Sequence, residues 1–190
     1  QAVDKLAASD ATPGQRHVQI LAEIMKLRRA CCHAQLIVPD APPTSAKLEL
    51  FGETLDELLE NRHKALVFSQ FVDHLSIVRR YLDDRGVSYQ YLDGSTSIRE
   101  RKKQVDAFQS GQGDLFLISL RAGGQGLNLT AADYVIHLDP WWNPAVEDQA
   151  SDRAHRIGQE RPVTIYRLVA KDTIEEKIVD LHARKRDLAD

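Results

Sequence analysis

The chain contains little cysteine. Its only two cysteines, Cys31 and Cys32, are adjacent and are poorly placed to bridge each other. Together with His33 they lack the ligand spacing of a zinc site, and no second ligand pair follows. We therefore expect buried thiols in a helix and a reducing, intracellular compartment.

Long apolar segments and a strong excess of one charge are also absent. No run of 18 or more apolar residues occurs, and the start lacks a basic stretch followed by an apolar one, so we expect no membrane span and no secretory signal. The first residue is Gln1 and not Met, which suggests a segment of a longer protein. A net charge of −3, with 43% hydrophobic and 28% charged residues, is typical of a soluble globular domain. This balance argues against a wholly basic nucleic-acid coat but permits a local basic surface.

Two common phosphate-binding signatures are missing. No G-x-x-x-x-G-K-S/T run occurs, and the glycines lack the G-x-G-x-x-G spacing of dinucleotide-binding folds. An enzyme that holds a nucleotide by itself on a doubly wound sheet needs such a loop, so we rank that class of enzyme low.

From residue 64 onward, predicted strands alternate with predicted helices. Short apolar runs predict strands at 65–68, 88–92, 114–118, 134–138 and 163–169. This alternation predicts an α/β fold, a parallel sheet with helices on both faces. Two helices, at about 15–32 and 45–60, precede the first strand as an appended helical element, and another helix follows Thr173. We divide the chain into a helical linker at 1–63, a sheet-containing lobe at 64–170 and a C-terminal helix at 171–190.

The most informative stretch runs from Gln149 to Gln159. Read as a helix, it places Gln149, Arg153 and Arg156 at positions i, i+4 and i+7, which is one helical face. Two guanidiniums on one face suit phosphate oxygens and can stabilise a transferring phosphoryl group across a cleft. The alternative is a solvated face on which nearby acidic side chains pair with the arginines.

Polar loops follow the first three predicted strands, at the edge where parallel sheets bind ligands. Ser69 and Gln70 follow the first strand, and Gly94 and Ser95 follow the second. The third strand leads into a glycine-rich loop at 119–126, where backbone amides can approach a phosphate closely. A tight strand-to-helix turn is the alternative for that loop. The loop with Gly94 either holds a nucleic-acid backbone without reading sequence or simply turns into the next helix.

The segment 139–143 lies between the fourth strand and the arginine-bearing stretch. Trp141 and Trp142 can stack on bases, but we favour packing of the following helix against the sheet. Asp139 has the chemistry of an acid, a base or a metal ligand, yet no second carboxylate is placed to share a metal ion. We predict no metal-ligating residues in this chain.

Five segments, in this order, resemble the second RecA-like lobe of Swi/Snf-type translocases in helicase superfamily 2. They are Lys64–Phe71, Leu92–Thr96, Ser119–Leu129, Asp139–Pro144 and Gln149–Gln159. The likeness covers about residues 22–184, with 27–33 similar to the helix before the lobe and the last helix similar to the family's C-terminal brace. It implies a RecA-like fold and an ATP-driven motor on double-stranded DNA that remodels or displaces DNA-bound proteins. ATP and Mg²⁺ then lie between two lobes.

The resemblance also implies roles for individual residues. Gln149, Arg153 and Arg156 match the motif that supplies arginine fingers to the γ-phosphate, and Gly126 and Asn128 match the loop that approaches the nucleotide. A third set matches segments that face the DNA backbone: Ser69, Gln70, Gly94, Ser95, Ser119, Arg121, Ala122 and Gly123. Arg121 departs from the family, which more often has Lys there, although both side chains can meet a phosphate.

The other half of such an active site is absent from this chain. Neither the phosphate-binding lysine loop nor an Asp-Glu-x-His motif for Mg²⁺ and water occurs, and in the family both belong to the first lobe. The resemblance thus implies the N-terminal lobe of the same polypeptide as a partner, and negligible ATP hydrolysis by this chain alone. We expect a monomer without a membrane partner, in the cytoplasm or nucleoid of a bacterium or the nucleus of a eukaryote.

Two other functions stay open. A strand-separating DNA or RNA helicase would share the fold, but the Asp139–Pro144 segment and the Arg-Ile-Gly-Gln ending at Gln159 favour the Swi/Snf type. A non-catalytic module that binds DNA or a protein partner has no need for the spacing of the two arginines. Contacts to DNA phosphates alone predict an affinity that falls steeply with salt and depends little on DNA sequence.

Overall fold

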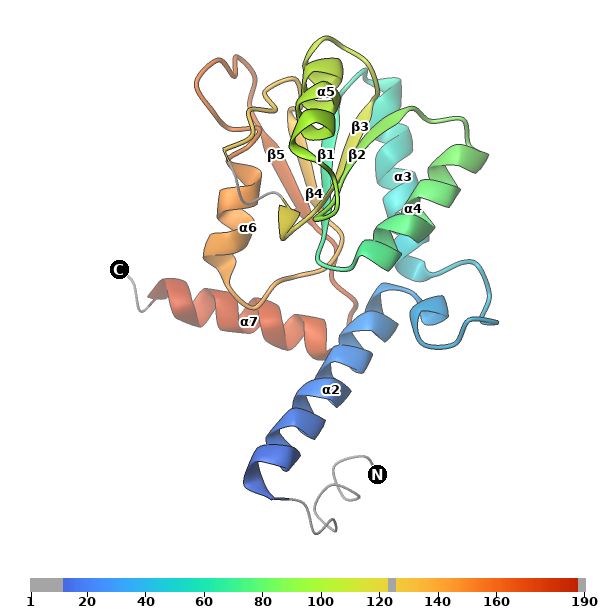
Figure 1. The fold of residues 1–190 in the computed structure, drawn as a ribbon, viewed down its shortest axis with the longest axis vertical. Coiled ribbons are helices and arrows are strands. Elements are labelled where there is room, and N and C mark those ends of the chain that lie inside the picture. The colour runs from blue at the N-terminus through green and yellow to red at the C-terminus, as the bar shows by residue number, and fades with distance from the viewer. Residues whose placement is uncertain (1–11, 123–125, 188–190) are drawn as a thin grey trace.

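A five-stranded sheet forms the centre of the molecule. The computed structural model describes residues 12–122 and 126–187. The strands are β1 (Ala65–Ser69), β2 (Tyr89–Leu92), β3 (Leu115–Ser119), β4 (Tyr134–His137) and β5 (Thr164–Arg167). They lie in the order β2-β3-β1-β4-β5, and every neighbouring pair is parallel. All carboxyl ends therefore share one edge of the sheet, as the alternation of strands and helices predicts (Figure 1).

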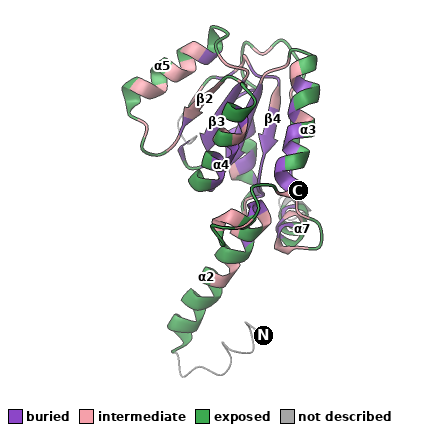
Figure 2. Ribbon diagram, turned by 90° about the vertical axis from the view of Figure 1, so that its right-hand side faces the viewer, coloured by how far each residue is buried: buried purple, intermediate pink, exposed green. Residues whose placement is uncertain are grey.

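Helices cover both faces of the sheet, and Figure 2 shows β3 and β4 buried, whereas the edge strand β5 is largely exposed. On one face, α3 (Ala46–Glu60) and α4 (Val72–Asp84) pack in a core that includes Val67 and Leu117. On the other, α5 (Ile98–Gln109) and α6 (Pro144–Ser151) pack in a core that includes Phe68 and Phe116. Neighbouring residues of a strand point to opposite faces, so strands buried on both sides are apolar at every position.

The helix α3 belongs to the cover of the sheet and is more than an extension before it. Its buried apolar side chains are Leu48, Phe51, Leu55 and Leu58. Their spacing of three and four residues places them on one face of the helix. The Ser45 side chain begins the helix by accepting a hydrogen bond from the Leu48 amide at 3.1 Å. The division of the chain at residues 63 and 170 stays a prediction.

Two further helices lie beyond the carboxyl edge of the sheet. The helix α2 (Pro13–Cys32) and the helix α7 (Ile174–Asp187) contact each other there, and the short helix η1 (Ala34–Leu36) follows α2 (Figure 1). A capping box at Thr12 and a proline at the first position explain why α2 begins at Pro13. In the described residues, no helix has the length and apolar character needed to span a membrane.

Candidate nucleotide and nucleic-acid site

The arginine-bearing stretch is not a single helix, so the prediction of one helical face from Gln149 to Gln159 was wrong. The helix α6 ends at Ser151, because the amides of Arg153 and Ala154 bond to carbonyls only three residues back, at 3.2 and 3.1 Å. Residues 152–158 continue as turns and a bend, and Gly158 has a positive φ of 99°. Gln149 stays exposed on the helix, Arg153 is buried and Arg156 is exposed.

The side chain of Gln159 holds this turn in place, a role that the sequence does not indicate. Its amide nitrogen donates to the carbonyls of Thr130, Ala132 and Ala154 at 3.1, 2.8 and 3.0 Å. Its oxygen accepts from the Arg161 amide at 3.1 Å. The bonds to Thr130 and Ala132 join the turn to the chain before β4, and the bond to Ala154 satisfies a carbonyl that a longer helix would have used. The only indication in the sequence was that a Gln ends the segment Gln149–Gln159, which resembles the Swi/Snf-type lobes.

The two arginines meet the predicted nucleotide loop in different ways. The Arg156 guanidinium donates to the Gly126 carbonyl at 3.0 Å, and the Leu129 amide donates to the Arg153 carbonyl at 2.9 Å. The Arg153 side chain is 2% exposed, and its Nε has no hydrogen-bond partner. Burial and the nearby charge of Arg156 lower the pKa of Arg153 from its ordinary value. An unpartnered buried guanidinium nitrogen is suited to an anionic ligand.

Glu147 of α6 pairs with groups other than these arginines, whereas the charge of Asp152 acts on Arg153 and opposes the lowering of its pKa. Glu147 is fully buried, and its Oε1 accepts from Arg167 of β5 at 2.6 Å. Its second oxygen lies 3.7 Å from the His182 ring of α7. Glu147 thus joins α6 to the sheet and to the C-terminal helix.

The loops after β1 and β3 converge, as their position at the carboxyl edge predicts. Ser69 and Ser119 face each other in the register of β1 and β3, and the Leu120 amide donates to the Ser69 carbonyl at 2.8 Å. Gln70 and Arg121 line one hollow of about 470 Å³ together with Arg29 of α2. Ser69, Ser119 and Ala122 are buried, whereas Gly94, Ser95 and Arg121 are exposed. Gly123 lies outside the described residues.

Arg101 of α5 links the loop after β2 to the loop after β3. Its guanidinium donates to the carbonyls of Thr96, Ala122 and Asp93 at 3.0, 2.9 and 3.2 Å. The hydroxyl and amide of Ser95 donate to the Asp93 carboxylate at 2.6 and 2.8 Å. The hydroxyl bond from Ser95 is the main reason why the pKa of Asp93 lies below its usual value. The Ser95 loop is therefore a fixed structure, and Arg101 is a second residue whose role the sequence does not indicate.

The two tryptophans pack against other protein groups, in keeping with the interpretation favoured from the sequence. Trp141 packs against the second core. Both indole rings also face the buried Arg28 of α2, with its guanidinium carbon 5.4 Å from the Trp141 ring centre and 5.0 Å from that of Trp142. Arg28 donates to the Pro140 carbonyl at 3.2 Å. It thereby attaches the helix before the lobe to the loop that leads into α6.

One group of potential metal ligands occurs among the residues that the structure describes. One ligand atom from each of Cys32, His74 and Asp139 lies within 4.8 Å of the other two, and all three residues are buried. Both oxygens of Asp139 already accept hydrogen bonds from Ser69 and Gln70. The positive charges of Arg28 and Lys47 also act on this group. Because its charge is already balanced by protein groups, we assign no metal to it.

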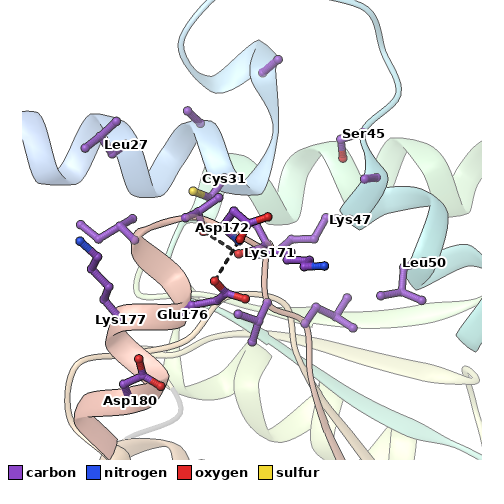
Figure 3. A pocket seen from close by; sticks show the side chains of 18 of the residues that line it. Leu27, Cys31, Ser45, Lys47, Leu50, Lys171, Asp172, Glu176, Lys177 and Asp180 are labelled. Atoms are coloured by element: carbon purple, nitrogen blue, oxygen red, sulfur yellow. Dashed lines mark hydrogen bonds between the residues drawn. The ribbon is translucent and has the colours of Figure 1, made fainter.

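A larger hollow lies between α2 and α7, beside the chain that follows β5. It measures about 1260 Å³, and residues such as Leu27, Cys31, Lys47 and Lys177 line it (Figure 3). None of the predicted site residues lines this hollow. The candidate site is therefore formed by the loops after β1, β2 and β3 and by the arginine segment.

Comparison with known proteins identifies the family to which this chain belongs. The model of the helicase conserved C-terminal domain matches residues 47–158. The solved C-terminal domain of the Sulfolobus solfataricus SWI2/SNF2 ATPase is 32% identical, with a TM-score of 0.79 over 97% of this chain and 78% of that one. The chain belongs to the Swi/Snf family. It is a C-terminal, RecA-like lobe of the SNF2 type.

Two further proteins match over most of the chain. The Sulfolobus solfataricus SWI2/SNF2 ATPase core in complex with double-stranded DNA is 34% identical, with a TM-score of 0.83 over 98% of this chain and 40% of that one. The putative ATP-dependent helicase/translocase YwqA of Bacillus subtilis (strain 168) is 40% identical over 93% of this chain and 20% of its own length. The chain spans only 16 to 20% of three curated relatives.

Proposed function

We propose that this lobe is the second half of an ATP-dependent motor that translocates on double-stranded DNA and remodels or displaces DNA-bound proteins. One observation carries the proposal: the polar loops after β1, β2 and β3 share the carboxyl edge of the sheet, and Arg156 of the arginine segment donates to the Gly126 carbonyl, which belongs to the connection between β3 and β4. Membership of the Swi/Snf family and the likeness to an ATPase core solved with double-stranded DNA support it.

On the nucleotide side, Arg153 and Arg156 would place positive charge on the γ-phosphate, with Gln149 nearby on α6. The unpartnered Nε of buried Arg153 and the weakly tethered, exposed Arg156 fit a phosphate group. Bound ATP supplies the phosphoryl group that is transferred to water. The described residues offer arginines and backbone amides near Gly126 and Asn128, but no paired carboxylates. The N-terminal lobe would therefore hold Mg²⁺ and most of the nucleotide.

On the DNA side, the loops that contain Gln70, Ser95 and Arg121 would contact phosphates of the backbone. Backbone amides, hydroxyls and a guanidinium hold phosphates without reading the bases, which suits a motor that moves along any sequence. Such binding weakens steeply as salt rises. Strong preference for one duplex sequence at fixed salt would contradict this assignment.

The deciding experiment measures ATP hydrolysis by the complete protein, with and without duplex DNA, for the wild type and Arg156→Ala. We expect DNA to stimulate the wild type and the substitution to reduce hydrolysis about 10³-fold, the scale of arginine fingers in GTPases. ATP should still bind. Arg161→Ala is the matched control, because Arg161 is also exposed and donates to the Ala131 carbonyl at 2.9 Å. It should keep most of the activity.

Two outcomes favour the other functions. Equal activity of Arg156→Ala and Arg161→Ala would mean that the arginine segment is only a surface, and the lobe would then be a module that binds DNA or a partner. Release of a labelled strand from a duplex during ATP hydrolysis would identify a strand-separating helicase. Negligible hydrolysis by residues 1–190 alone is a further expectation.

A further inference from the structure

Asp139 is a buried carboxylate at the carboxyl edge of the sheet, and it is 3% exposed. Its Oδ1 accepts a short hydrogen bond from the Ser69 hydroxyl, and its Oδ2 accepts from the Gln70 amide at 3.2 Å. The Ser69 hydroxyl oxygen in turn accepts from the Phe71 amide at 3.1 Å. Three consecutive residues of the loop after β1 are therefore held, directly or through Ser69, by one carboxylate.

The surroundings of Asp139 keep it ionised. Burial alone would favour the neutral acid, but the ring of His74, the charge of Lys47 and the Ser69 hydroxyl outweigh it and lower the pKa of Asp139. The His74 Nδ1 lies 3.7 Å from Oδ1. A carboxylate has no proton to donate, so both of its oxygens are available as charged acceptors for the Ser69 hydroxyl and the Gln70 amide.

Asp139 also stands at a junction between the two halves of the candidate site. The Leu138 amide donates to the Phe68 carbonyl at 2.9 Å, which joins the ends of β4 and β1. The chain then continues through Asp139 to the tryptophans and into α6, which precedes the arginine segment. A shift of the loop that contains Asp139 can therefore displace the loop after β1 through the Asp139 side chain.

We propose that Asp139 is a positioning residue that fixes the turn at Ser69–Phe71 and thereby holds Gln70 for contact with DNA phosphates. It touches neither DNA nor nucleotide and acts through the two residues that it holds. Loss of its charge removes the acceptor that orients the Ser69 hydroxyl and the Gln70 amide, and the loop then contacts the backbone less well. The proposal rests on the proposed DNA-binding function.

The test uses the complete protein and compares the wild type with Asp139→Asn, which has the same shape without the charge. We expect the affinity for a duplex of arbitrary sequence to fall about tenfold at fixed salt, as for one or two weakened charge-assisted bonds. The slope of log affinity against log salt should change little, because no cationic contact to a phosphate is lost. Hydrolysis at saturating DNA should change little.

The matched control is Glu175→Gln. Glu175 is 1% exposed and pairs with Lys47 at 2.6 Å, so this variant also removes the charge of a buried, ion-paired carboxylate. Glu175 holds the Ala170 amide near the start of α7, not a loop of the DNA-facing edge. Thermal stability should fall in both variants, whereas DNA affinity should fall only in Asp139→Asn.

A double-mutant cycle with Ser69→Ala tests whether Asp139 acts through Ser69. If it does, the double variant loses less affinity than the sum of the two single losses. Three results would overturn the proposal: unchanged DNA affinity in Asp139→Asn, an equal loss in Glu175→Gln, or a stoichiometric metal ion in the wild type that Asp139→Asn lacks. A wild type that fails to bind duplex DNA is a different result, since it removes the proposed function itself.

Discussion

The loops after β1 and β2 and the segment after α6 both carry predicted site residues, but they are held in place differently. The loops rest on charged side chains from neighbouring elements, Asp139 and Arg101, whose bonds all go to protein groups. The segment is held by Gln159 through backbone carbonyls, while its own arginines are less constrained. Arg156 has one bond to a carbonyl, and the Nε of Arg153 has none.

This difference indicates which half of the site is complete within the lobe. A buried donor without a partner costs roughly 1–3 kcal/mol, and such a group persists where a ligand satisfies it. The loop after β1 also contains one such group, the Gln70 Nε2, but Asp139 and Arg101 hold the backbones of the DNA-facing loops, so their course is largely set before DNA binds. In the arginine segment, the Arg153 Nε has no partner and the Arg156 side chain has one bond to a carbonyl. This is the arrangement expected of a surface that meets a phosphate held by another lobe.

The strongest test of this contrast is Arg153→Met, which keeps the length of the side chain and removes its charge. In the complete protein, DNA-stimulated hydrolysis should fall about 10²–10³-fold, the usual cost of one donor to a transition state. Urea unfolding of this chain should show the same stability or a gain of about 1 kcal/mol, because the variant has no unpartnered Nε. A loss of stability with retained hydrolysis would show that Arg153 is structural.

The second test acts on the loops. Arg101→Ala removes three bonds to the carbonyls of Thr96, Ala122 and Asp93. Duplex-DNA affinity of the complete protein should fall roughly tenfold to a hundredfold, while hydrolysis at saturating DNA changes little. Lys103→Ala, on the exposed side of α5, is the control and should alter the salt slope by at most about one. Similar losses in both variants would mean that Arg101 contributes only charge.

Much of the fold is predictable from the sequence, because burial on both faces makes a parallel strand apolar throughout. The run from Ala65 to Phe68 predicted β1 to within one residue. The failure came after Ser151, where periodicity favoured a continued helix. Tertiary hydrogen bonds from Gln159 replace helical ones there, and periodicity contains no information about such bonds.

The candidate site, like the fold, was predictable from the sequence only in part. Polar loops after successive parallel strands must share an edge, so the proximity of Ser69, Gln70 and Arg121 followed from topology alone. The side chains that position these loops could not be found in this way. Arg101 and Asp139 act mainly on backbone groups, and any residue supplies a backbone carbonyl or amide, so no pairing of residue types indicates the contact.

The smallest effect concerns His137, whose Nε2 lies 3.0 Å from the hydroxyl of Ser151, the last residue of α6. Burial, with the charge of Arg167, lowers the pKa of His137 to about 4. The unfolded chain binds the proton near pH 6.5, so acid favours unfolding between these values, and stability should fall by about 1 kcal/mol from pH 7 to pH 5.5.

The difference between the wild type and His137→Gln in urea unfolding isolates this contribution, since the carboxylates titrate in both. Equal slopes would show that folding leaves the pKa of His137 unchanged. A steeper wild-type slope would mean that mild acid weakens the contact between His137 and Ser151 at the end of α6. Asp139 stays ionised at the same pH because its pKa is lowered, so the loop after β1 keeps its acceptor.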